Sequence, residues 1–452
     1  MSATDNNGIG MPLTQADTTA TEFAKLVYDY TAMIGAGARE MSLTFKPLSS
    51  YKYDSDFIVT LTCGDWSQRI EYSADIAPNA EQTVTVPLSG TMDTDTVCVT
   101  VSHKDSTSIP QTYTIAVSKL PPVNTTFTVT PADATIFLTE DSSGSRIYPE
   151  ADGTFILNTN ASYTYVITQN GYVAQTASFT AGEANKAITI DLEKAPESAY
   201  KDIQVEGDWI NFRGETNGIV DAKTPIKAED AVLEWANKIG EGMDSGATGC
   251  PIIVGGYIYT YAGQSIVKVN KNTGEVVAAG VMIGSSSFAI NSPTYANGMI
   301  FVGLSNGRVQ AFNAETLESL WVFQDALGGQ PNCPIAYSDG YIYTGFWNSE
   351  TKQANFVCLT VTDEDTANTT ESKLPTWTYT HNGFYSAGAY ACEDYVLIGT
   401  DDGDTGYTKG FASILSLDPK TGVLLDEEKL PNVGDQRSSI CYDAATDAYY
   451  FT

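Results

Sequence analysis

The hydrophobic and polar positions of the C-terminal half return in the same order several times. Each copy runs from a short apolar stretch, through a turn of small or acidic residues, into a second stretch rich in Tyr, Ile and Val. The copies cover residues 250–259, 292–301, 333–343, 387–397 and 441–450. Gly256, Gly298 and Gly340 in the first three turns are each 42 residues apart. Short strands repeating at this interval are typical of β-propeller blades, and we expect four-stranded blades over residues 205–452.

From residue 41 onward, the N-terminal part alternates apolar and polar residues with a period of two. Such runs cover residues 41–45, 57–62, 83–86, 96–101 and 112–117. A second series follows Pro121-Pro122, which restricts the backbone and marks a boundary. Short alternating strands separated by turn residues predict two β-sandwich modules, at 41–120 and 123–194. The expected fold class is therefore all-β.

Residues 1–40 precede this alternation and form a lead-in of another kind. Between residues 19 and 34, apolar side chains fall at helical spacing, at Phe23, Leu26, Val27, Tyr30 and Ile34. A glycine pair at 35 and 37 is suited to end a helix. One short helix is predicted here.

The entry to the repeat region contains strand-like runs without inner strands beside them. Residues 208–213, 217–220 and 232–239 resemble the outer strands of a blade. Ring propellers commonly close by placing an N-terminal strand beside the last C-terminal strands, because closure removes exposed strand edges. We expect residues 209–239 to complete the last blade in this way. The propeller is then a C-terminally truncated part of a larger ring.

Composition and charge narrow the functional classes. The net charge of −31 with only 24 Lys and Arg residues disfavours nucleic acid and anionic lipid as partners. No apolar run reaches the roughly 20 residues of a transmembrane helix. Residues 1–8 lack the basic and apolar regions of a signal peptide. Either the protein is cytosolic or a signal peptide has been removed, and the modular all-β composition favours an extracellular or cell-surface location.

The seven cysteines are scattered and include no CxxC pair, which argues against a zinc ribbon or a thioredoxin-like motif. Cys63 and Cys98 fall in predicted strands of the first sandwich, where they either form a disulfide or fill core space. Cys250, Cys333 and Cys441 share one position, at the start of the innermost strand of a repeat. Small side chains fit there, so we favour packing over redox chemistry for these three.

The third strand of each repeat carries the clearest motif. Residues 266–274, 309–317 and 414–422 share a strand, an Asn or Asp and a turn of the Thr-Gly type, and Trp321 and Trp377 stand in outer strands. This pattern resembles the PQQ-like propeller repeat of quinoprotein alcohol dehydrogenases. Residues 129–136, 152–155 and 169–173 resemble turns of the PEGA family, whose modules act as spacers or adhesive units. Residues 111–118 resemble the closing strand of cadherin-like modules.

The propeller resemblance implies an enzyme chemistry that these residues do not match. Quinoprotein dehydrogenases hold pyrroloquinoline quinone between a tryptophan and an adjacent Cys-Cys ring, with Ca²⁺ and a base Asp. This sequence contains no Cys-Cys dipeptide, and Trp321 and Trp377 stand where tryptophans dock neighbouring blades. Only two histidines exist, His103 and His381, and they lie in different modules, so a His-based metal site or Ser-His-Asp triad is disfavoured. We predict no catalytic residues and no bound quinone.

One loop is a candidate metal site. Residues 399–406 are rich in glycine and include Asp401, Asp402 and Asp404, whose carboxylate oxygens suit Ca²⁺. The spacing is not that of an EF-hand, and a solvated hairpin is the competing interpretation. A second acidic run, residues 363–365, is expected to be a solvated loop.

These features favour a non-catalytic bacterial protein at the cell surface or outside the cell. We expect two sandwich modules to carry a propeller that serves as a binding platform for a protein or carbohydrate partner. Two alternatives stay open: a divergent quinoprotein dehydrogenase, and a scaffold for envelope assembly. Fold resemblance alone does not decide between them, because one fold supports many functions.

Overall fold

The computed structural model describes the side chains of residues 122–452, except at 183, 198–199, 215–226, 228, 240–248, 285–291 and 406–409. Within residues 1–121 it describes only the backbone of nine strands. The chain divides into two compact units, each described here by itself. The first comprises Met1–Thr128, Leu138–Tyr165 and Ala177–Ile190; the second comprises Val129–Phe137, Val166–Thr176 and Asp191–Thr452.

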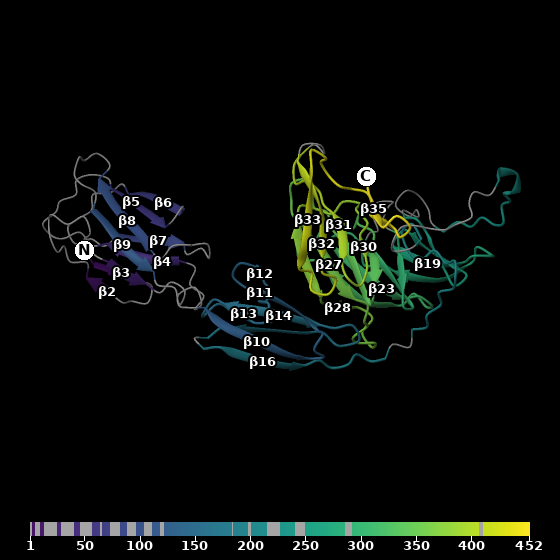
Figure 1. Cartoon of the computed structure of the whole chain (residues 1–452), viewed down its shortest axis with the longest axis horizontal. Coiled ribbons are helices and arrows are strands. Elements are labelled where there is room, and N and C mark those ends of the chain that lie inside the picture. The colour runs from purple at the N-terminus through teal and green to yellow at the C-terminus, as the bar shows by residue number, and fades with distance from the viewer. Residues whose placement is uncertain are drawn as a thin grey trace. The chain divides into compact units, whose positions relative to one another are not determined.

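The N-terminal strands of the first unit form one five-stranded sheet and two strand pairs (Figure 1). The five-stranded sheet has the order β3 (Lys25–Tyr28), β9 (Gln111–Val117), β8 (Thr96–His103), β5 (Phe57–Cys63), β6 (Trp66–Tyr72). The pairs are β4 (Glu40–Phe45) with β7 (Gln82–Pro87), and β1 (Ser2–Thr4) with β2 (Gly10–Pro12). Five of these strands coincide with the predicted runs, whereas β6 was not predicted. The side chains of Cys63 and Cys98 lie outside the described residues.

The helix predicted within residues 19–34 is wrong where the structure describes that segment. Residues 25–28 form strand β3, which pairs in parallel with β9 and places Lys25 opposite Thr114 and Tyr28 opposite Val117. The segment Leu-Val-Tyr has high strand propensity, and the free edge of β9 supplies hydrogen-bond partners for its backbone. Pairing within the sheet therefore overrides a weak helical spacing.

Two further sheets carry an aromatic core between them. One sheet contains β10 (Val123–Thr130), β13 (Phe155–Leu157) and β16 (Lys186–Asp191); the other contains β11 (Thr135–Glu140), β12 (Arg146–Ile147), β14 (Ser162–Thr168) and β15 (Gln175–Thr180). The ring of Phe127 lies 5.5 Å from that of Phe155, 5.4 Å from that of Tyr165 and 6.3 Å from that of Phe179. Because these rings come from both sheets, the two sheets pack face to face.

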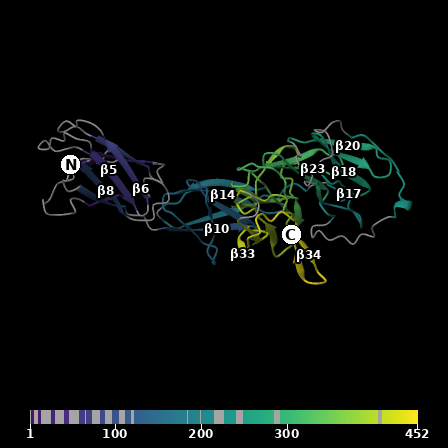
Figure 2. The same cartoon turned by 90° about the horizontal axis from the view of Figure 1, so that it is seen from above.

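Four successive sheets follow in the second unit (Figures 1 and 2). Each has four consecutive antiparallel strands, as predicted for propeller blades, and the second sheet has β28 (Glu371–Lys373) as an additional fifth strand. Blade 1 contains β17 (Ile252–Val254), β18 (Tyr257–Ala262), β19 (Ser265–Asn270) and β20 (Val276–Val281). Blade 2 contains β21 (Thr294–Ala296), β22 (Met299–Leu304), β23 (Arg308–Asn313) and β24 (Ser319–Gln324). Blade 3 contains β25 (Ala336–Ser338), β26 (Tyr341–Gly345), β27 (Ala354–Thr360) and β29 (Trp377–His381). Blade 4 contains β30 (Tyr390–Ala391), β31 (Val396–Gly399), β32 (Phe411–Leu417) and β33 (Leu424–Pro431), and a final hairpin pairs β34 (Cys441–Asp443) with β35 (Ala448–Tyr450).

Neighbouring blades share buried apolar clusters. Tyr261 of blade 1 packs in one cluster with Val302 of blade 2, and Phe301 packs with Val357 of blade 3. A third cluster joins Tyr343 of blade 3 to blade 4. The apolar faces of consecutive sheets therefore bury one another, which accounts for the fold of the repeat region.

The Asx–Thr–Gly type turns of blades 1, 2 and 4 each accept hydrogen bonds from the preceding segment through one carbonyl group. In blade 4 the carbonyl of Pro419 accepts hydrogen bonds from the indole of Trp377 (3.0 Å) and the hydroxyl of Tyr343 (3.2 Å). A Cβ on Gly422 would lie 2.4 Å from Trp377, so only glycine lets the indole rest on this turn. In blade 2 the equivalent carbonyl, of Ala314, accepts a bond from Tyr259 (2.7 Å). The predicted blade-docking role of Trp377 is confirmed.

The entry segment behaves partly as predicted. Trp235 donates to the carbonyl of Lys271 at 2.8 Å and lies against Gly274, the contact that Trp377 makes with Pro419 and Gly422. Trp235 therefore contacts the turn of blade 1 in the way that Trp377, in the outer strand of blade 3, contacts the turn of blade 4. Trp209 does not belong to an outer strand, because it bridges to Ile253 in the innermost strand of blade 1. Residues 217–220 lie outside the described residues.

The acidic run at residues 363–365 is not simply a solvated loop. Asp363 is 3% exposed and accepts a hydrogen bond from Tyr200, while the Lys373 ammonium lies 2.5 Å from Glu364. Residues 371–373 form β28 (Glu371–Lys373), which pairs in parallel with the outer strand β24 of blade 2. The segment between β27 and β29 is an insertion in blade 3. Contacts with distant residues hold it in place, and its strand β28 becomes the fifth strand of blade 2.

Helical structure is rare in the described residues. They contain one 3-10 turn, η1 (Ala228–Asp230). Among these residues no helix has the length and apolar character needed to cross a membrane.

The carbonyl contact between blades can be tested with two tyrosines of one strand. Tyr259 and Tyr261 are both 0% exposed, but only Tyr259 donates to a described partner, the carbonyl of Ala314. Tyr259→Phe should lower the free energy of unfolding by about 1–2 kcal/mol, because it leaves a buried carbonyl unpaired. Tyr261→Phe, the matched control, should change it by less than about 0.5 kcal/mol. Equal losses in urea unfolding would show that the contact does not stabilise the ring.

Candidate functional site

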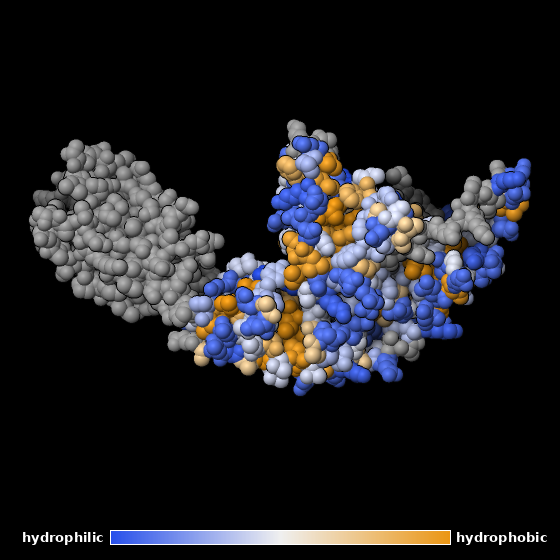
Figure 3. All heavy atoms as spheres, viewed as in Figure 1, coloured by the Kyte–Doolittle hydropathy of each residue, from blue (hydrophilic) through white to orange (hydrophobic). Residues whose placement is uncertain are grey.

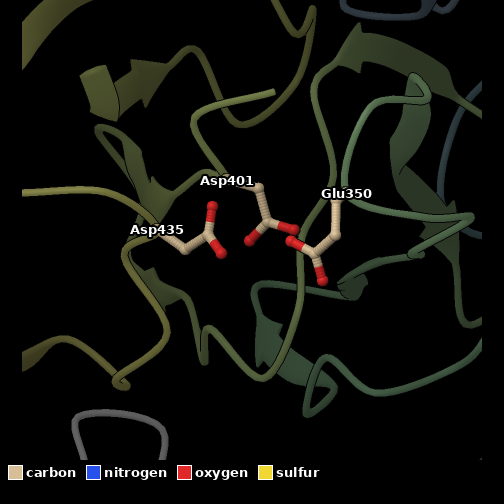
Figure 4. A group of neighbouring side chains, drawn as sticks. All are labelled: Glu350, Asp401 and Asp435. Carbon is tan, nitrogen blue, oxygen red and sulfur yellow. The ribbon is translucent and has the colours of Figure 1, made fainter. Parts of the chain in front are cut away.

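Loops of blades 3 and 4 bring three carboxylates together (Figure 4). Glu350 lies in the loop between β26 and β27, Asp401 follows β31, and Asp435 follows β33. One carboxylate oxygen of each lies within 4.8 Å of the others. In Figure 4 the carboxylate of Asp401 stands between those of Asp435 and Glu350. We call these three residues the acidic cluster.

Backbone hydrogen bonds fix the position of Asp401. Its amide donates to the carbonyl of Gly383 at 2.9 Å, in the loop that leads from blade 3 to blade 4. The preceding residue, Thr400, accepts a bond from the amide of Gln436 at 3.0 Å. The loop after β31 is thus held on both sides by connections between blades. The position of Asp401 therefore depends on the stacking of the blades as well as on its own loop.

Asp435 is held by the loop that it faces. Its Oδ1 accepts a hydrogen bond from the amide of Asp402 at 2.9 Å. Its side chain is only 3% exposed, whereas that of Glu350 is 20% exposed. The cluster is therefore buried at Asp401 and Asp435 and reaches solvent at Glu350.

Among the described residues, Arg437 brings positive charge to the acidic cluster. Its Nη2 lies 2.7 Å from Asp435 Oδ2 and 3.2 Å from Glu350 Oε2, while its Nε lies 3.8 Å from Asp401 Oδ1. The guanidinium carbon lies 4.3 Å from the ring centre of Tyr385. Three carboxylates and one guanidinium carry a formal charge of −2 when all are ionised.

Asp401 is the least compensated member of the cluster. Its side chain is 1% exposed, and no described residue makes a hydrogen bond of normal geometry to either carboxylate oxygen, although the Trp347 indole lies beside them. Burial and the nearby charge of Asp435 raise the pKa of Asp401 to about 7, against the opposing effect of Arg437. Burial also raises the pKa of Asp435. These shifts express the cost of placing two negative charges away from water.

Two aromatic side chains border the cluster. The rings of Trp347 and Tyr385 lie 5.0 Å apart at an interplanar angle of 70°. Both residues are half-buried. A Cβ on Gly383 would lie 3.0 Å from both Trp347 Cδ1 and Asp401 Oδ2, so the indole and the buried carboxylate flank the same backbone. Charged and aromatic groups therefore meet on one set of loops.

The structure separates the three aspartates predicted from the sequence. Asp401 joins the acidic cluster. Asp402 instead accepts backbone hydrogen bonds from Asp404 (2.8 Å) and Gly410 (2.9 Å), and Asp404 accepts one from Thr405. Glu350 and Asp435 were not predicted, because they lie on other loops and no local motif marks them.

A separate hollow of about 280 Å³ lies beside the insertion of blade 3. Its lining is mostly polar and includes Glu197, Tyr200, Glu318 and Asp363. Burial raises the pKa of Asp363, whose carboxylate accepts a hydrogen bond from Tyr200. Among the described residues that line this hollow none is basic, and we assign it no chemistry.

The two tryptophans of the outer strands, Trp321 and Trp377, do not fit a quinone site. Trp321 and Trp377 are both 0% exposed, and Trp377 rests on the turn at Gly422. Trp321 packs against Phe301 and lies 5.6 Å from the Lys373 ammonium. Neither indole offers a face to a ligand, and the sequence has no adjacent cysteine pair to cover one. We derive no step through such a cofactor.

Comparison with known proteins identifies the repeat. A family model described as the outer membrane protein assembly factor BamB matches residues 216–347. The C-terminal part of the chain thus carries PQQ-like β-propeller repeats, as the sequence motif predicted. No curated protein sequence matches the chain.

Solved structures with related folds are distant in sequence. A quinohemoprotein alcohol dehydrogenase from Pseudomonas putida HK5 is 14% identical and one from Comamonas testosteroni 15%; each match covers 52% of this chain and 43% of the dehydrogenase, with a TM-score of 0.38. BamB from Moraxella catarrhalis is 10% identical over 68% of this chain and 93% of its own, with a TM-score of 0.31. The chain thus spans less than half the length of the two dehydrogenases.

The role of Arg437 as charge partner can be tested by its removal. Arg437→Gln in a chelator-containing buffer leaves three carboxylates without a guanidinium. Breaking a buried ion pair costs about 3–5 kcal/mol, and the 28% exposure of the Arg437 side chain reduces the expected loss to about 1–3 kcal/mol. The free energy of unfolding should recover in part in Arg437→Gln/Asp435→Asn, which removes one negative charge as well. Equal stability of the wild type and the single variant would contradict this role.

Proposed function

We propose that the protein is a non-catalytic binding protein, located at the bacterial cell surface or outside the cell. Its propeller serves as a platform for a protein or carbohydrate partner. The N-terminal sheets act as spacers that carry the platform. The net charge of −31 supports a solvated, self-repelling surface.

The observation that carries this proposal is the group of side chains around Arg437. Trp347 and Tyr385 are half-buried, and the guanidinium of Arg437 stacks on Tyr385. Trp, Tyr and Arg are the residue types that dominate binding energy at protein interfaces. Aromatic rings with a polar neighbour also present an apolar face and hydrogen-bonding groups together, as sugar rings require. The loops of a rigid scaffold are the usual place for such groups.

The surface of the blades agrees with a local binding site and not with a broad apolar interface. Figure 3 shows hydrophobic surface interrupted by hydrophilic surface over the blades in that view. Exposed apolar residues occur singly or in small groups on outer strands, such as Val281 in blade 1 and Leu425 in blade 4. Scattered residues of this kind are normal on soluble proteins.

A scaffold for envelope assembly is the second candidate. The match of residues 216–347 to a family model described as an outer membrane assembly factor favours it. A scaffold of this type would engage a partner peptide along the edge of a blade, by adding a strand. The insertion of blade 3 already adds a strand to a blade edge within this chain, because its strand β28 pairs in parallel with the outer strand β24 of blade 2.

The platform can be tested by screening the whole chain against a glycan array and a displayed peptide library. For any ligand found, Trp347→Ala and Tyr385→Ala should each weaken binding at least about tenfold, as expected when an interface aromatic is lost. Glu318→Gln, at the hollow beside the insertion, is the control and should leave the affinity unchanged.

Two results would overturn the proposal. One is a ligand whose affinity is lowered by Glu318→Gln and not by the aromatic variants. The other is the absence of any ligand together with reduction of a dye electron acceptor when pyrroloquinoline quinone, Ca²⁺ and an alcohol are added. The second result would favour the dehydrogenase alternative.

A further inference from the structure

We infer that Glu350, Asp401 and Asp435 form a binding site for a divalent cation of the calcium class, which links blade 3, blade 4 and the segment leading to the final hairpin. The three carboxylates come from three different loops, and each loop belongs to a different connection of the propeller. A cation held by all three would join these connections. This inference does not depend on the proposed binding function.

The spacing of the carboxylates fits a calcium ion. Calcium–oxygen distances are about 2.3–2.6 Å, so two ligands on opposite sides of one ion lie about 5 Å apart. Ligand oxygens of the acidic cluster all lie within 4.8 Å of one another. In Figure 4 the three carboxylates converge on one region and do not point to separate surfaces.

The burial of Asp401 is the independent observation that points to a ligand. A carboxylate that is 1% exposed needs positive charge or hydrogen-bond donors. Among the described residues no donor makes a hydrogen bond of normal geometry to its two oxygens; the Trp347 indole lies beside the carboxylate, and the nearest guanidinium nitrogen lies 3.8 Å away. Because the side chain is enclosed, the missing partner must be compact. A metal ion meets this condition, whereas a peptide side chain or a sugar ring does not.

The donor set selects among cations. All three side chains offer oxygen, which suits Ca²⁺ and Mg²⁺ and not metals that prefer sulfur or imidazole. Mg²⁺ gives up its water reluctantly and requires near-octahedral geometry, whereas Ca²⁺ accepts irregular ligand sets. A buried site built from three separate loops therefore favours Ca²⁺.

Arg437 defines the competing interpretation, a purely structural ion-pair network. It already neutralises Asp435 and Glu350, at 2.7 Å and 3.2 Å. It leaves Asp401 without a hydrogen bond, and the formal charge of the four groups stays negative. Arg437 is also 28% exposed and stacked on Tyr385, so it can serve the outer side of the cluster while an ion serves Asp401. The two interpretations predict different responses to Ca²⁺ once the guanidinium is removed.

Calcium binding should be measured on the whole chain after chelation, by isothermal titration with CaCl₂ and by terbium luminescence. Trp347 flanks the same backbone as Asp401, so excitation of indole should sensitise Tb³⁺ in the site. We expect saturable Tb³⁺ emission that Ca²⁺ displaces and that Trp347→Phe reduces at least fivefold. No heat and no displaceable emission would overturn the inference.

Variants identify the ligands. Glu350→Gln and Asp435→Asn should each weaken Ca²⁺ binding at least tenfold, whereas Asp404→Asn, on the same loop as Asp401 but outside the cluster, should change it less than twofold. Glu350 is partly exposed and lies in a loop, so its substitution preserves the fold, as circular dichroism should verify. If Asp404→Asn weakens binding as much as Glu350→Gln, the ion lies in the loop 399–406 and this assignment is wrong.

Arg437→Gln separates a cation site from an ion-pair network. For a cation site, loss of the competing guanidinium should tighten Ca²⁺ binding at least threefold, and Ca²⁺ should raise the melting temperature of this variant more than that of the wild type. For a network without an ion, the variant should be destabilised and Ca²⁺ should not restore it. The second outcome would contradict the proposal.

Discussion

The ring of blades depends on the contact between one blade's buried aromatic donors and one carbonyl group of the next blade. The Asx–Thr–Gly turn presents this carbonyl, and its glycine leaves room for an indole above the backbone. Trp377 and Tyr343 share the carbonyl of Pro419, Tyr259 uses that of Ala314, and Trp235 uses that of Lys271. Because Trp377, Tyr343 and Tyr259 are buried, their contacts also satisfy polar groups that would otherwise be costly inside the protein.

The acidic cluster is a consequence of this stacking. Its members stand on loops that meet only because successive blades are held in register, and backbone bonds from Asp401 to Gly383 and from Gln436 to Thr400 fix their approach. The assembly concentrates negative charge where water is excluded. Such an arrangement persists when the surrounding structure compensates it, by a guanidinium, a bound cation or protonation. Arg437 provides the first of these, and we propose that a cation held by Asp401 and its neighbours provides the second.

Local sequence patterns predicted the blades well and the site poorly, for a physical reason. The strand runs, the Asx–Thr–Gly turns and Trp377 are encoded within a few residues of one another, so periodicity and turn chemistry reveal them. Asp401 was found through its own acidic loop, but Glu350 and Asp435 reach it only through packing between blades. The same limit explains the other differences: β3 depends on the edge of β9, and burial of Asp363 depends on the distant Tyr200.

The loops of blades 3 and 4 meet at a buried charged centre, which we propose binds a cation. Anomalous diffraction from crystals grown with Tb³⁺ in place of Ca²⁺ would locate such an ion. We expect a peak within bonding distance of oxygens from Glu350, Asp401 and Asp435, with Arg437 on the outer side. An anomalous map without a peak at these residues, with the guanidinium of Arg437 in contact with Asp401, would contradict it.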